Sequence, residues 1–432
     1  MVKSLTLAAV IVPSVWAINT DGRLYSSFVS LSIELIGFPD WAETAPSTTT
    51  LTTPTASSCR HADPGAWQCI GPRFFDSYGA FPAGTLYSHN FNVATWNASG
   101  FHTLEATVPL ACSALRGQLS LFEIGNEPDL YVGKRRDSNY DVHDYLADWA
   151  NTTARFEHFL KQACPDMASE QQLHYMFPSV SSPVSRLRVP DMFAAAVGGS
   201  SSSIKRVTQV SVHNYMAGAT QPGVTLQATL MNHTAVARSL AGHVAYAKSV
   251  EASDADYVIG EHNSLYGAGA AGLSDVFGAA LWGVDFALQA AATGVVKRVH
   301  FTSLSARPTP RGPRPRHGRR SRRTTVKTLA LGGRADLDSG YGAYVDGRLE
   351  RLALLNLREW SRRRTGRSKR LSAAAACDKT GITFNGFAYE AETMDKPARV
   401  ASRASNEQVK ADKSGKLAIE VADSEAIVVL QK

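Results

Sequence analysis

The chain has 432 residues, of which 44% are hydrophobic, and this composition excludes a wholly disordered protein and allows a large buried core. Its 45 Lys and Arg against 38 Asp and Glu give a net charge of +7, which by itself suggests a polyanionic partner. Residues 307–323 and 358–370 contribute +8 and +6 of that charge, so the rest of the chain sums to −7. The body of the protein is therefore mildly acidic.

The first 17 residues have the pattern of a secretory signal peptide. Lys3 supplies the positive charge, residues 5–12 form an apolar run, and residues 15–17 place small side chains around a cleavable bond. A buried first strand is the alternative, although Pro13 fits a strand poorly. No later run approaches the roughly 20 apolar residues of a membrane span. We therefore expect a secreted, extracellular protein without a membrane span.

Sequons and cysteines add to this expectation. Three Asn-X-Ser/Thr tripeptides, at Asn97, Asn151 and Asn232, are candidate N-glycosylation sites. The cysteines allow one or two disulfides and leave an odd thiol, with the pairing open: Cys59, Cys69, Cys112, Cys164 and Cys377. None of them has the paired short spacing of a zinc site, so no metal is expected.

Residues 18–302 alternate short apolar stretches with longer amphipathic ones. Strands are predicted at residues 28–34, 103–110, 119–125, 174–180, 207–213, 257–261 and 296–301, and helices at residues 142–164, 225–252 and 273–292. Such alternation predicts parallel βα units, and hence an α/β domain.

A different pattern occupies residues 334–432. Residues 341–345 and 349–357 flank Asp346-Gly347, a dipeptide typical of a tight hairpin turn. Further strands are predicted at residues 382–389 and at residues 417–430, the latter interrupted by Asp423-Ser424. Because no helix separates these strands, they indicate an antiparallel β-sandwich domain.

Two segments fit neither pattern. Residues 46–58 are rich in Ser, Thr and Pro, and residues 303–333 contain an Arg- and Pro-rich tract. The Arg tract is interpreted as a solvated linker, and a patch for an anionic polysaccharide or nucleic acid is the alternative. No aromatic residue interleaves with this tract and the chain is expected to be secreted, so no nucleic-acid partner is expected.

Two predicted strands end in a glutamate. Asn126-Glu127-Pro128 closes one of them, because proline cannot continue a central ladder, and Glu261 ends the other. In a parallel barrel the carboxyl ends of the strands share one face, where active sites form. Two carboxylates there suit glycoside hydrolysis, in which one protonates the leaving oxygen and the other attacks or activates water. A carboxylate that caps the next helix is the alternative for Glu127.

Three motifs make the prediction specific. The segments Gly125-Asn-Glu-Pro-Asp129, Ser211-Val-His-Asn-Tyr215 and Gly260-Glu-His-Asn-Ser264 resemble glycoside hydrolase family 79, which contains β-glucuronidases and heparanase-like enzymes. The resemblance covers residues 26–45 and 70–302, and more weakly residues 341–432. It implies a (β/α)8 barrel that carries a β-sandwich. It also implies a retaining hydrolase of β-glucuronides with Glu127 as the acid/base and Glu261 as the nucleophile, and it requires no cofactor.

Further residues are candidates for substrate binding. As in related barrels, Asn126 is expected to hydrogen-bond the sugar 2-hydroxyl. Tyr215, near His213, is expected to orient Glu261 or to touch the sugar, with packing on the barrel rim as the alternative. His262 and Asn263 are candidates for lining the cleft. Asp129 is expected to cap a helix.

The sequence departs from the family at two places. No Arg-x-Gly-Gly type motif follows the first strand, where residues 46–58 stand, and the Arg tract replaces a loop that helps to hold the glucuronate carboxylate. We hypothesise that both tracts are translated from misassigned gene sequence, which sequencing of the transcript tests. A barrel that lacks a strand has unpaired edges. The alternative function is therefore a catalytically impaired carbohydrate-binding relative, and the aglycone and the oligomeric state stay open.

Overall fold

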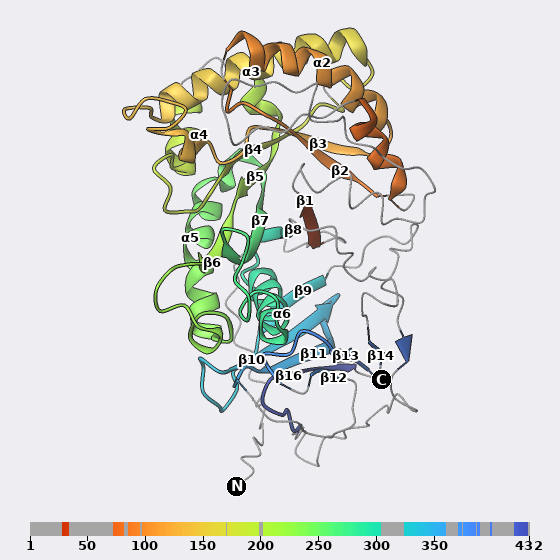
Figure 1. Ribbon diagram of the computed structural model, residues 1–432, viewed down its shortest axis with the longest axis vertical. Coiled ribbons are helices and arrows are strands. Elements are labelled where there is room, and N and C mark those ends of the chain that lie inside the picture. The colour runs from red at the N-terminus through yellow and green to blue at the C-terminus, as the bar shows by residue number, and fades with distance from the viewer. Residues whose placement is uncertain are drawn as a thin grey trace.

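A computed structural model shows a parallel sheet with its helices and, below them in Figure 1, an antiparallel sheet. The structure describes residues 28–33, 72–81, 85–95, 97–169, 171–197, 202–303, 324–359, 370–373, 375–385, 387–388, 398–399 and 419–430. The expected signal peptide, the Ser/Thr/Pro tract and the Arg tract of residues 307–323 lie outside these ranges. No helix in the described part of the chain is both long and apolar enough to cross a membrane.

The parallel sheet is a barrel that is incomplete on one side. Its strands follow the order β1-β8-β7-β5-β4-β3-β2, with β6 beside β7. The first strand pairs with the last one, Val29 opposite Val299, as the first and last strands of a barrel do. Within the described ranges no strand lies between β1 and β2, so the ring is open there. The strands are β1 (Val29–Ile33), β2 (Tyr87–Phe91), β3 (Leu119–Ile124), β4 (Tyr175–Val180), β5 (Val207–Val212), β6 (Asn214–Gly218), β7 (Asp256–Tyr266) and β8 (Val296–Ser303).

Most strand predictions for this sheet are confirmed, because its central strands are buried on both faces. Every residue of β4 is buried, which explains its continuous apolar run. The strand predicted at residues 103–110 is wrong, since these residues lie in helix α2 (Ala98–Leu115). The buried residues of α2 recur every three to four positions along one face, a period that the β-branched composition conceals: Leu104, Val108, Ala111, Cys112 and Leu115.

The other helices cover the outside of the barrel. The helix predicted at residues 142–164 is confirmed as α3 (Val142–Ala163), where Asp141 and Asp144 form a capping box. The stretch 225–252 is divided, because Asn232 caps a new helix by accepting the Ala235 N–H at 2.9 Å. The remaining segments are α4 (Val189–Val197), α5 (His233–Ser249), α6 (Phe277–Ala292), the 3-10 helices η2 (Pro72–Ala80), η3 (Pro128–Tyr131), η4 (Ser202–Arg206) and η6 (Glu251–Ser253), and the π-helical η5 (Leu226–Leu230).

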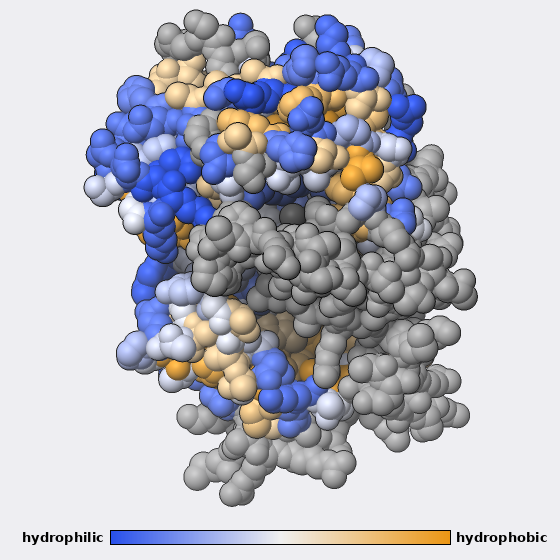
Figure 2. Space-filling model, turned by 45° about the horizontal axis from the view of Figure 1, so that its top comes forward, coloured by the Kyte–Doolittle hydropathy of each residue, from blue (hydrophilic) through white to orange (hydrophobic). Residues whose placement is uncertain are grey.

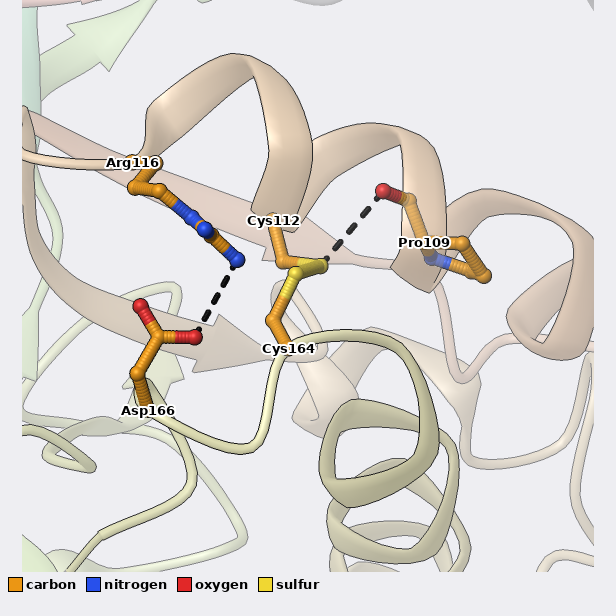
Figure 3. The surroundings of a disulfide bond; sticks show 5 residues. All are labelled: Pro109, Cys112, Arg116, Cys164 and Asp166. Atoms are coloured by element: carbon orange, nitrogen blue, oxygen red, sulfur yellow. Dashed lines mark hydrogen bonds and ion pairs between the residues drawn. A yellow bond between two sulfur atoms is a disulfide. The ribbon is translucent and has the colours of Figure 1, made fainter.

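One disulfide ties two of these helices together. Cys112 near the end of α2 bonds Cys164 at the end of α3, and an exposed Arg116–Asp166 ion pair of 3.1 Å lies beside the bond (Figure 3). Cys377 is free and exposed. Among the described cysteines, one bridge and one odd thiol agree with the expectation. The surface over α2 and α3 is largely hydrophilic with smaller apolar areas (Figure 2), as expected for helices with one buried face.

The antiparallel module is confirmed, and its described strands form one sheet of order β15-β14-β13-β12-β16-β11-β10-β9. Asp346 and Gly347, with φ of 50° and 81°, make the predicted tight turn between β10 and β11. The predicted boundary at residue 334 is too late, because residues 324–328 already pair with β10. The strands are β9 (Thr324–Thr328), β10 (Asp338–Val345), β11 (Arg348–Asn356), β12 (Arg370–Ser372), β13 (Thr383–Phe384), β14 (Phe387–Ala388), β15 (Ala398–Arg399) and β16 (Glu425–Leu430).

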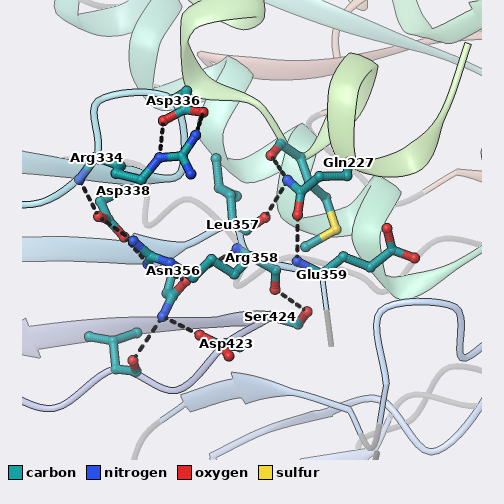
Figure 4. Close-up of polar contacts among 12 residues, drawn as sticks. Gln227, Arg334, Asp336, Asp338, Asn356, Leu357, Arg358, Glu359, Asp423 and Ser424 are labelled. Carbon is teal, nitrogen blue, oxygen red and sulfur yellow. Dashed lines mark hydrogen bonds and ion pairs between the residues drawn. The ribbon is translucent and has the colours of Figure 1, made fainter. Parts of the chain in front are cut away.

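Polar contacts join this sheet to the barrel. Gln227 of η5 donates to the Leu357 carbonyl at 3.0 Å and accepts the Glu359 N–H at 2.7 Å (Figure 4). On the sheet side Arg358 forms two hydrogen bonds with the Asp338 carboxylate, which fixes the segment that Gln227 contacts. The sheet is therefore attached to the side of the barrel that holds η5 and α6, away from β2 and β3 (Figure 1).

Candidate active site

Glu127 is presented at the carboxyl end of β3 by a turn of unusual backbone conformation. Gly125 has a φ of 94°, and a Cβ there would lie 2.6 Å from Val93 Cγ2, so this position requires glycine. Glu127 itself has φ 46° and ψ 53°, the left-handed region, and Pro128 then begins η3. A non-glycine residue in this region is uncommon and must be held by its surroundings. The Glu127 N–H donates to the Ser179 carbonyl at 2.9 Å.

The sequence had suggested that Glu261 ends its strand. In the structure Glu261 lies inside β7. The strand continues to Tyr266 because β6 pairs with its second half, where Tyr215 lies opposite Asn263. The Tyr215 hydroxyl donates to Glu261 Oε1 at 2.7 Å, which is the orienting contact expected of it. Burial, and then the charge of Glu261, raise the pKa of Tyr215, so this hydroxyl keeps its proton.

His213 brings the two glutamates together. Its Nδ1 lies 3.0 Å from Glu127 Oε1 and 3.6 Å from Glu261 Oε2, and one carboxylate oxygen of each glutamate and Nδ1 all lie within 4.8 Å of one another. The His213 side chain is 1% exposed, and those of Glu127 and Glu261 are 24% and 12% exposed. The pair predicted from residues 134 positions apart therefore meets at one partly open site.

The charge on His213 balances this acidic pair. Burial alone would lower the pKa of His213, but the negative charges of Glu261 and Glu127 outweigh burial and raise it to about 9. The imidazole is therefore protonated at neutral pH. Glu127, His213 and Glu261 could in principle ligate a metal ion, but a protonated imidazole offers Nδ1 as a donor and not as a ligand.

A third carboxyl group lies beside the pair and was missed in the sequence. Glu123 is on β3, and the Ser179 hydroxyl donates a hydrogen bond to its carboxyl group. Burial raises the pKa of Glu123 in spite of the Ser179 hydrogen bond and the positive charge of His213, while Glu261 adds to the rise. The available signal was an acidic residue within the apolar strand Leu119–Ile124.

The other candidate residues differ in what they contact. Asn126 is exposed next to Glu127, as a substrate contact would require. Asn263 is half-buried, and its Nδ2 donates to the Thr302 carbonyl of β8 at 2.8 Å. Asp129 does not cap a helix, since its carboxylate accepts the Ser181 N–H at 3.0 Å and so joins η3 to the end of β4.

His262 does not line the cleft. Its side chain is fully buried, and its ring lies 4.0 Å from the Phe301 ring and 4.7 Å from that of Phe286. Burial lowers its pKa to about 3, so the ring is neutral. Residues alternate between the two faces of a strand, and next to Glu261 on the inner face His262 must point outward, where α6 covers it.

The sequons lie on helices or beside them. Asn97 and Asn151 are exposed, whereas Asn232 is half-buried and its side chain caps α5. Glycosylation of these residues stays a prediction.

Comparisons with known proteins agree with this fold. Residues 340–428 match the model of the glycosyl hydrolase family 79 C-terminal beta domain. A protein of Aspergillus niger named beta-glucuronidase is 34% identical over 421 residues, which cover 83% of this chain and 75% of that protein. A beta-glucuronidase of Neurospora crassa is 35% identical over 357 residues and covers 73% of this chain, and the chain spans 63% of that relative.

Solved structures share the fold. A 4-O-α-L-rhamnosyl-β-D-glucuronidase from Fusarium oxysporum 12S, in complex with Rha-GlcA, matches with a TM-score of 0.67 and 18% identity over 99% of this chain and 100% of that one. A family 51 α-L-arabinofuranosidase from Bifidobacterium longum gives a TM-score of 0.52 with 12% identity over 91% of this chain and 88% of that one. The C-terminal match and the extent of the similarity to the Aspergillus protein establish that the chain belongs to glycoside hydrolase family 79 and is by family a glycosidase.

Proposed function

We propose that the protein is a secreted, retaining β-glucuronidase in which Glu127 is the acid/base and Glu261 the nucleophile. The observation that carries this proposal is the approach of the two carboxylates to one buried histidine, with the interacting oxygens and Nδ1 all within 4.8 Å. Retaining glycosidases hold their carboxyl groups about 5 Å apart, whereas inverting enzymes need room for water and a separation of about 6.5–9.5 Å. The short separation favours double displacement.

In the first step Glu261 attacks the anomeric carbon and the glycosidic C–O bond breaks. Glu127 gives its proton to the departing oxygen, and a glycosyl ester of Glu261 remains. In the second step the Glu127 carboxylate takes a proton from water, the water oxygen attacks the same carbon, and the ester bond to Glu261 breaks. Both glutamates return to their starting protonation, so no cofactor is consumed.

The neighbours of the pair have roles in these steps. The hydroxyl of Tyr215, 2.7 Å from Glu261, holds the attacking oxygen in place. The positive charge on His213, whose Nδ1 lies 3.6 Å from Glu261 Oε2, stabilises the carboxylate that attacks. Exposed Asn126 is placed to donate to the sugar 2-hydroxyl. Asn263 holds β7 to β8 through its 2.8 Å bond to Thr302, and so acts on position and not on the sugar.

The choice of a glucuronide as substrate is supported by the relatives. Both the Aspergillus and the Neurospora proteins are named beta-glucuronidase, at 34% and 35% identity. The chain spans 75% and 63% of these two proteins, so the activity of the whole relatives is carried over here as a proposal.

The direct test is hydrolysis of 4-nitrophenyl β-D-glucuronide by the wild type, Glu127→Gln and Glu261→Gln. Proton NMR of the first product should show the β-anomer of glucuronic acid, because two displacements retain configuration. Glu261→Gln should lose turnover by several orders of magnitude. An α-anomer as first product would contradict retention, and turnover that survives both substitutions would contradict the site. Binding of glucuronides without turnover by the wild type would support the impaired relative instead.

Secretion is supported by the signal-like residues 1–17 and by the Cys112–Cys164 disulfide, because such bonds persist in oxidising compartments. Expression of the full coding sequence in a fungal host should place the protein in the medium with Met1 to about residue 17 removed, as read by N-terminal sequencing. Treatment with a glycosidase that removes N-glycans should then lower its mass if any of the three sequons is occupied. Retention of an uncleaved chain in the cells would contradict secretion.

A further inference from the structure

Glu123 has no step in the proposed mechanism, yet it is built into the centre of the site. It lies on β3 four residues before Glu127, and both its neighbouring strands contribute a polar side chain to it. Ser179 near the end of β4 donates to its carboxyl group, and Asn90 lies opposite it on β2, where the Asn90 side chain interacts with the same group. A half-buried acid with a raised pKa and two polar neighbours is costly to place unless those contacts are used.

The first partner, Ser179, also contacts the backbone of the acid/base Glu127. Ser179 is fully buried and has a φ of 58°, a left-handed conformation like that of Glu127. Its hydroxyl binds Glu123, while its carbonyl accepts the Glu127 N–H at 2.9 Å. One residue thus joins the Glu123 carboxyl group to the peptide that carries the Glu127 side chain.

The second partner holds the turn from the other side. Asn90 lies opposite Glu123 in the β2–β3 ladder. Its Nδ2 donates to the Gly125 carbonyl at 2.8 Å, two residues before Glu127. The residues on both sides of Asn126 are therefore attached to the two residues that neighbour the Glu123 carboxyl group.

We propose that Glu123, Ser179 and Asn90 form a clamp that positions the acid/base Glu127 by holding its turn in the left-handed conformation. This inference rests on the proposed function, because it assigns positioning residues to the same reaction. The hydrogen bonds of the clamp lead to the turn that carries Glu127, whereas the nucleophile is held separately by Tyr215 on β6. Loss of the clamp should therefore impair proton transfer and spare nucleophilic attack.

Leaving groups separate these two effects. A 2,4-dinitrophenolate departs without a proton, whereas an alkoxide such as that of methyl β-D-glucuronide needs one. For Ser179→Ala, kcat/KM for the methyl glucuronide should fall about 10- to 100-fold, and kcat/KM for the dinitrophenyl glucuronide should fall only about twofold. Asn90→Ala should show the same bias. Equal losses on both substrates would overturn the proposal, because a general loss of structure has no preference for the leaving group.

Azide gives a second readout. A displaced Glu127 activates water poorly, so the glycosyl ester of Glu261 accumulates when the dinitrophenyl glucuronide is the substrate. Azide needs no base to attack. It therefore attacks the anomeric carbon of the ester and releases Glu261. In Ser179→Ala azide should raise kcat and yield β-glucuronyl azide. Glu123→Gln keeps an oxygen that accepts the Ser179 hydroxyl and should restore most of the methyl glucuronide activity that Glu123→Ala loses. Absence of both rescues would overturn the clamp.

Ser77→Ala is the matched control. Ser77 is also a fully buried serine, it lies on η2 away from the site, and in the described part of the chain its hydroxyl has no hydrogen-bond partner. Its removal should leave the leaving-group ratio unchanged, and a biased loss here would count against the clamp.

A crystal structure of Ser179→Ala decides the inference even if the wild type does not hydrolyse glucuronides. The clamp requires that Glu127 leaves its φ of 46° or that its 3.0 Å contact with His213 is lost. An unchanged turn would overturn the clamp. An inactive wild type with a displaced turn would contradict the proposed function and keep the clamp.

Discussion

The protonation state of His213 affects both the charge of the candidate site and the stability of the fold. The ring is buried between two carboxylates, at 3.0 and 3.6 Å from their oxygens. A buried imidazole without these charges would be neutral, as burial makes His262. Two histidines separated by 49 positions in one barrel are thus set to opposite charge states by what surrounds them.

The first prediction concerns the pH dependence of stability. The pKa of His213 in the folded protein is about 9 against an ordinary value of 6.5. A raised folded pKa means that the proton stabilises the fold, fully below about pH 6.5, and that this stabilisation disappears as the pH rises through 9. Urea unfolding should show that the wild type loses on the order of 3 kcal/mol between pH 6 and pH 9.5 beyond what His213→Gln loses. Parallel pH profiles for the two proteins would contradict this assignment.

The second prediction concerns Tyr215. Tyr215→Phe removes the 2.7 Å hydrogen bond to Glu261, and hydrogen bonds to charged groups contribute about 1.5–3 kcal/mol. We expect kcat/KM to fall about 10- to 100-fold, by the same factor for good and poor leaving groups, because Glu261 as the proposed nucleophile attacks both kinds of substrate. Tyr246→Phe is the control, since Tyr246 is buried and within the described residues its hydroxyl has no partner. A loss that grows with the pKa of the leaving group would contradict the role of Tyr215.

At the level of elements, the candidate site lies at the carboxyl ends of the barrel strands, where the chain leaves a strand and enters the following helix. Each helix returns the chain to the amino end of the next strand, so the ends of α2 and α3 lie on the face opposite Glu127. The disulfide between these ends therefore bears on stability and not on chemistry (Figure 3).

The third prediction follows from that separation. The Cys112–Cys164 bond closes a separation of 52 residues, and the double variant Cys112→Ala/Cys164→Ala should lose about 2–4 kcal/mol of stability. Thermal unfolding should show a lower Tm, and kcat/KM at 25 °C should stay within about twofold of the wild type. Cys377→Ala is the control, because Cys377 is exposed and free. Loss of activity at temperatures where the double variant stays folded would contradict the separation of bond and site.

Across the whole molecule, the barrel and the C-terminal sheet share a buried polar cluster. Asp285 on α6 is fully buried, accepts the Tyr341 hydroxyl of β10 at 2.6 Å and lies 3.0 Å from His233 Nδ1. Burial opposes the charged form of His233, but the hydrogen bond and charge of Asp285 raise its pKa. The buried Asp285 carboxylate of the barrel depends on a hydrogen bond from Tyr341 of the C-terminal sheet, so the stabilities of the barrel and the sheet are coupled.

The fourth prediction tests this coupling. Tyr341→Phe leaves the Asp285 carboxylate short of one donor and should lower the free energy of unfolding by about 1.5–3 kcal/mol, measured by urea denaturation. Tyr344→Phe on the same strand is the control, since its half-buried ring packs beside Lys327 and should change stability by less than about 0.5 kcal/mol. Equal effects of the two substitutions would show that the barrel and the sheet are not coupled through Asp285.

Sequence patterns predicted those parts of the fold that depend on local chemistry. The largely apolar segment Tyr175–Val180 marked β4, because both faces of a central parallel strand are buried. Strand β2 was missed, since Tyr-Ser-His-Asn-Phe is half polar and His89 is buried by contacts with Phe75, Tyr78 and Phe91. Helix α2 was taken for a strand because its β-branched residues outweighed a helical period that only the packing reveals.

Local sequence was enough to predict the pair of glutamates, because the proline after Glu127 ends its strand and an apolar run leads into Glu261 within β7. It also determined the two-part organisation, since the change from alternating helices to tight hairpins is local. Packing between distant segments set the contact of His213 with both carboxylates, the burial of His262 under α6, and the position of Glu123 beside the pair with Ser179. These depend on which residues of neighbouring strands face each other, and register is set by packing between segments that are distant in the chain.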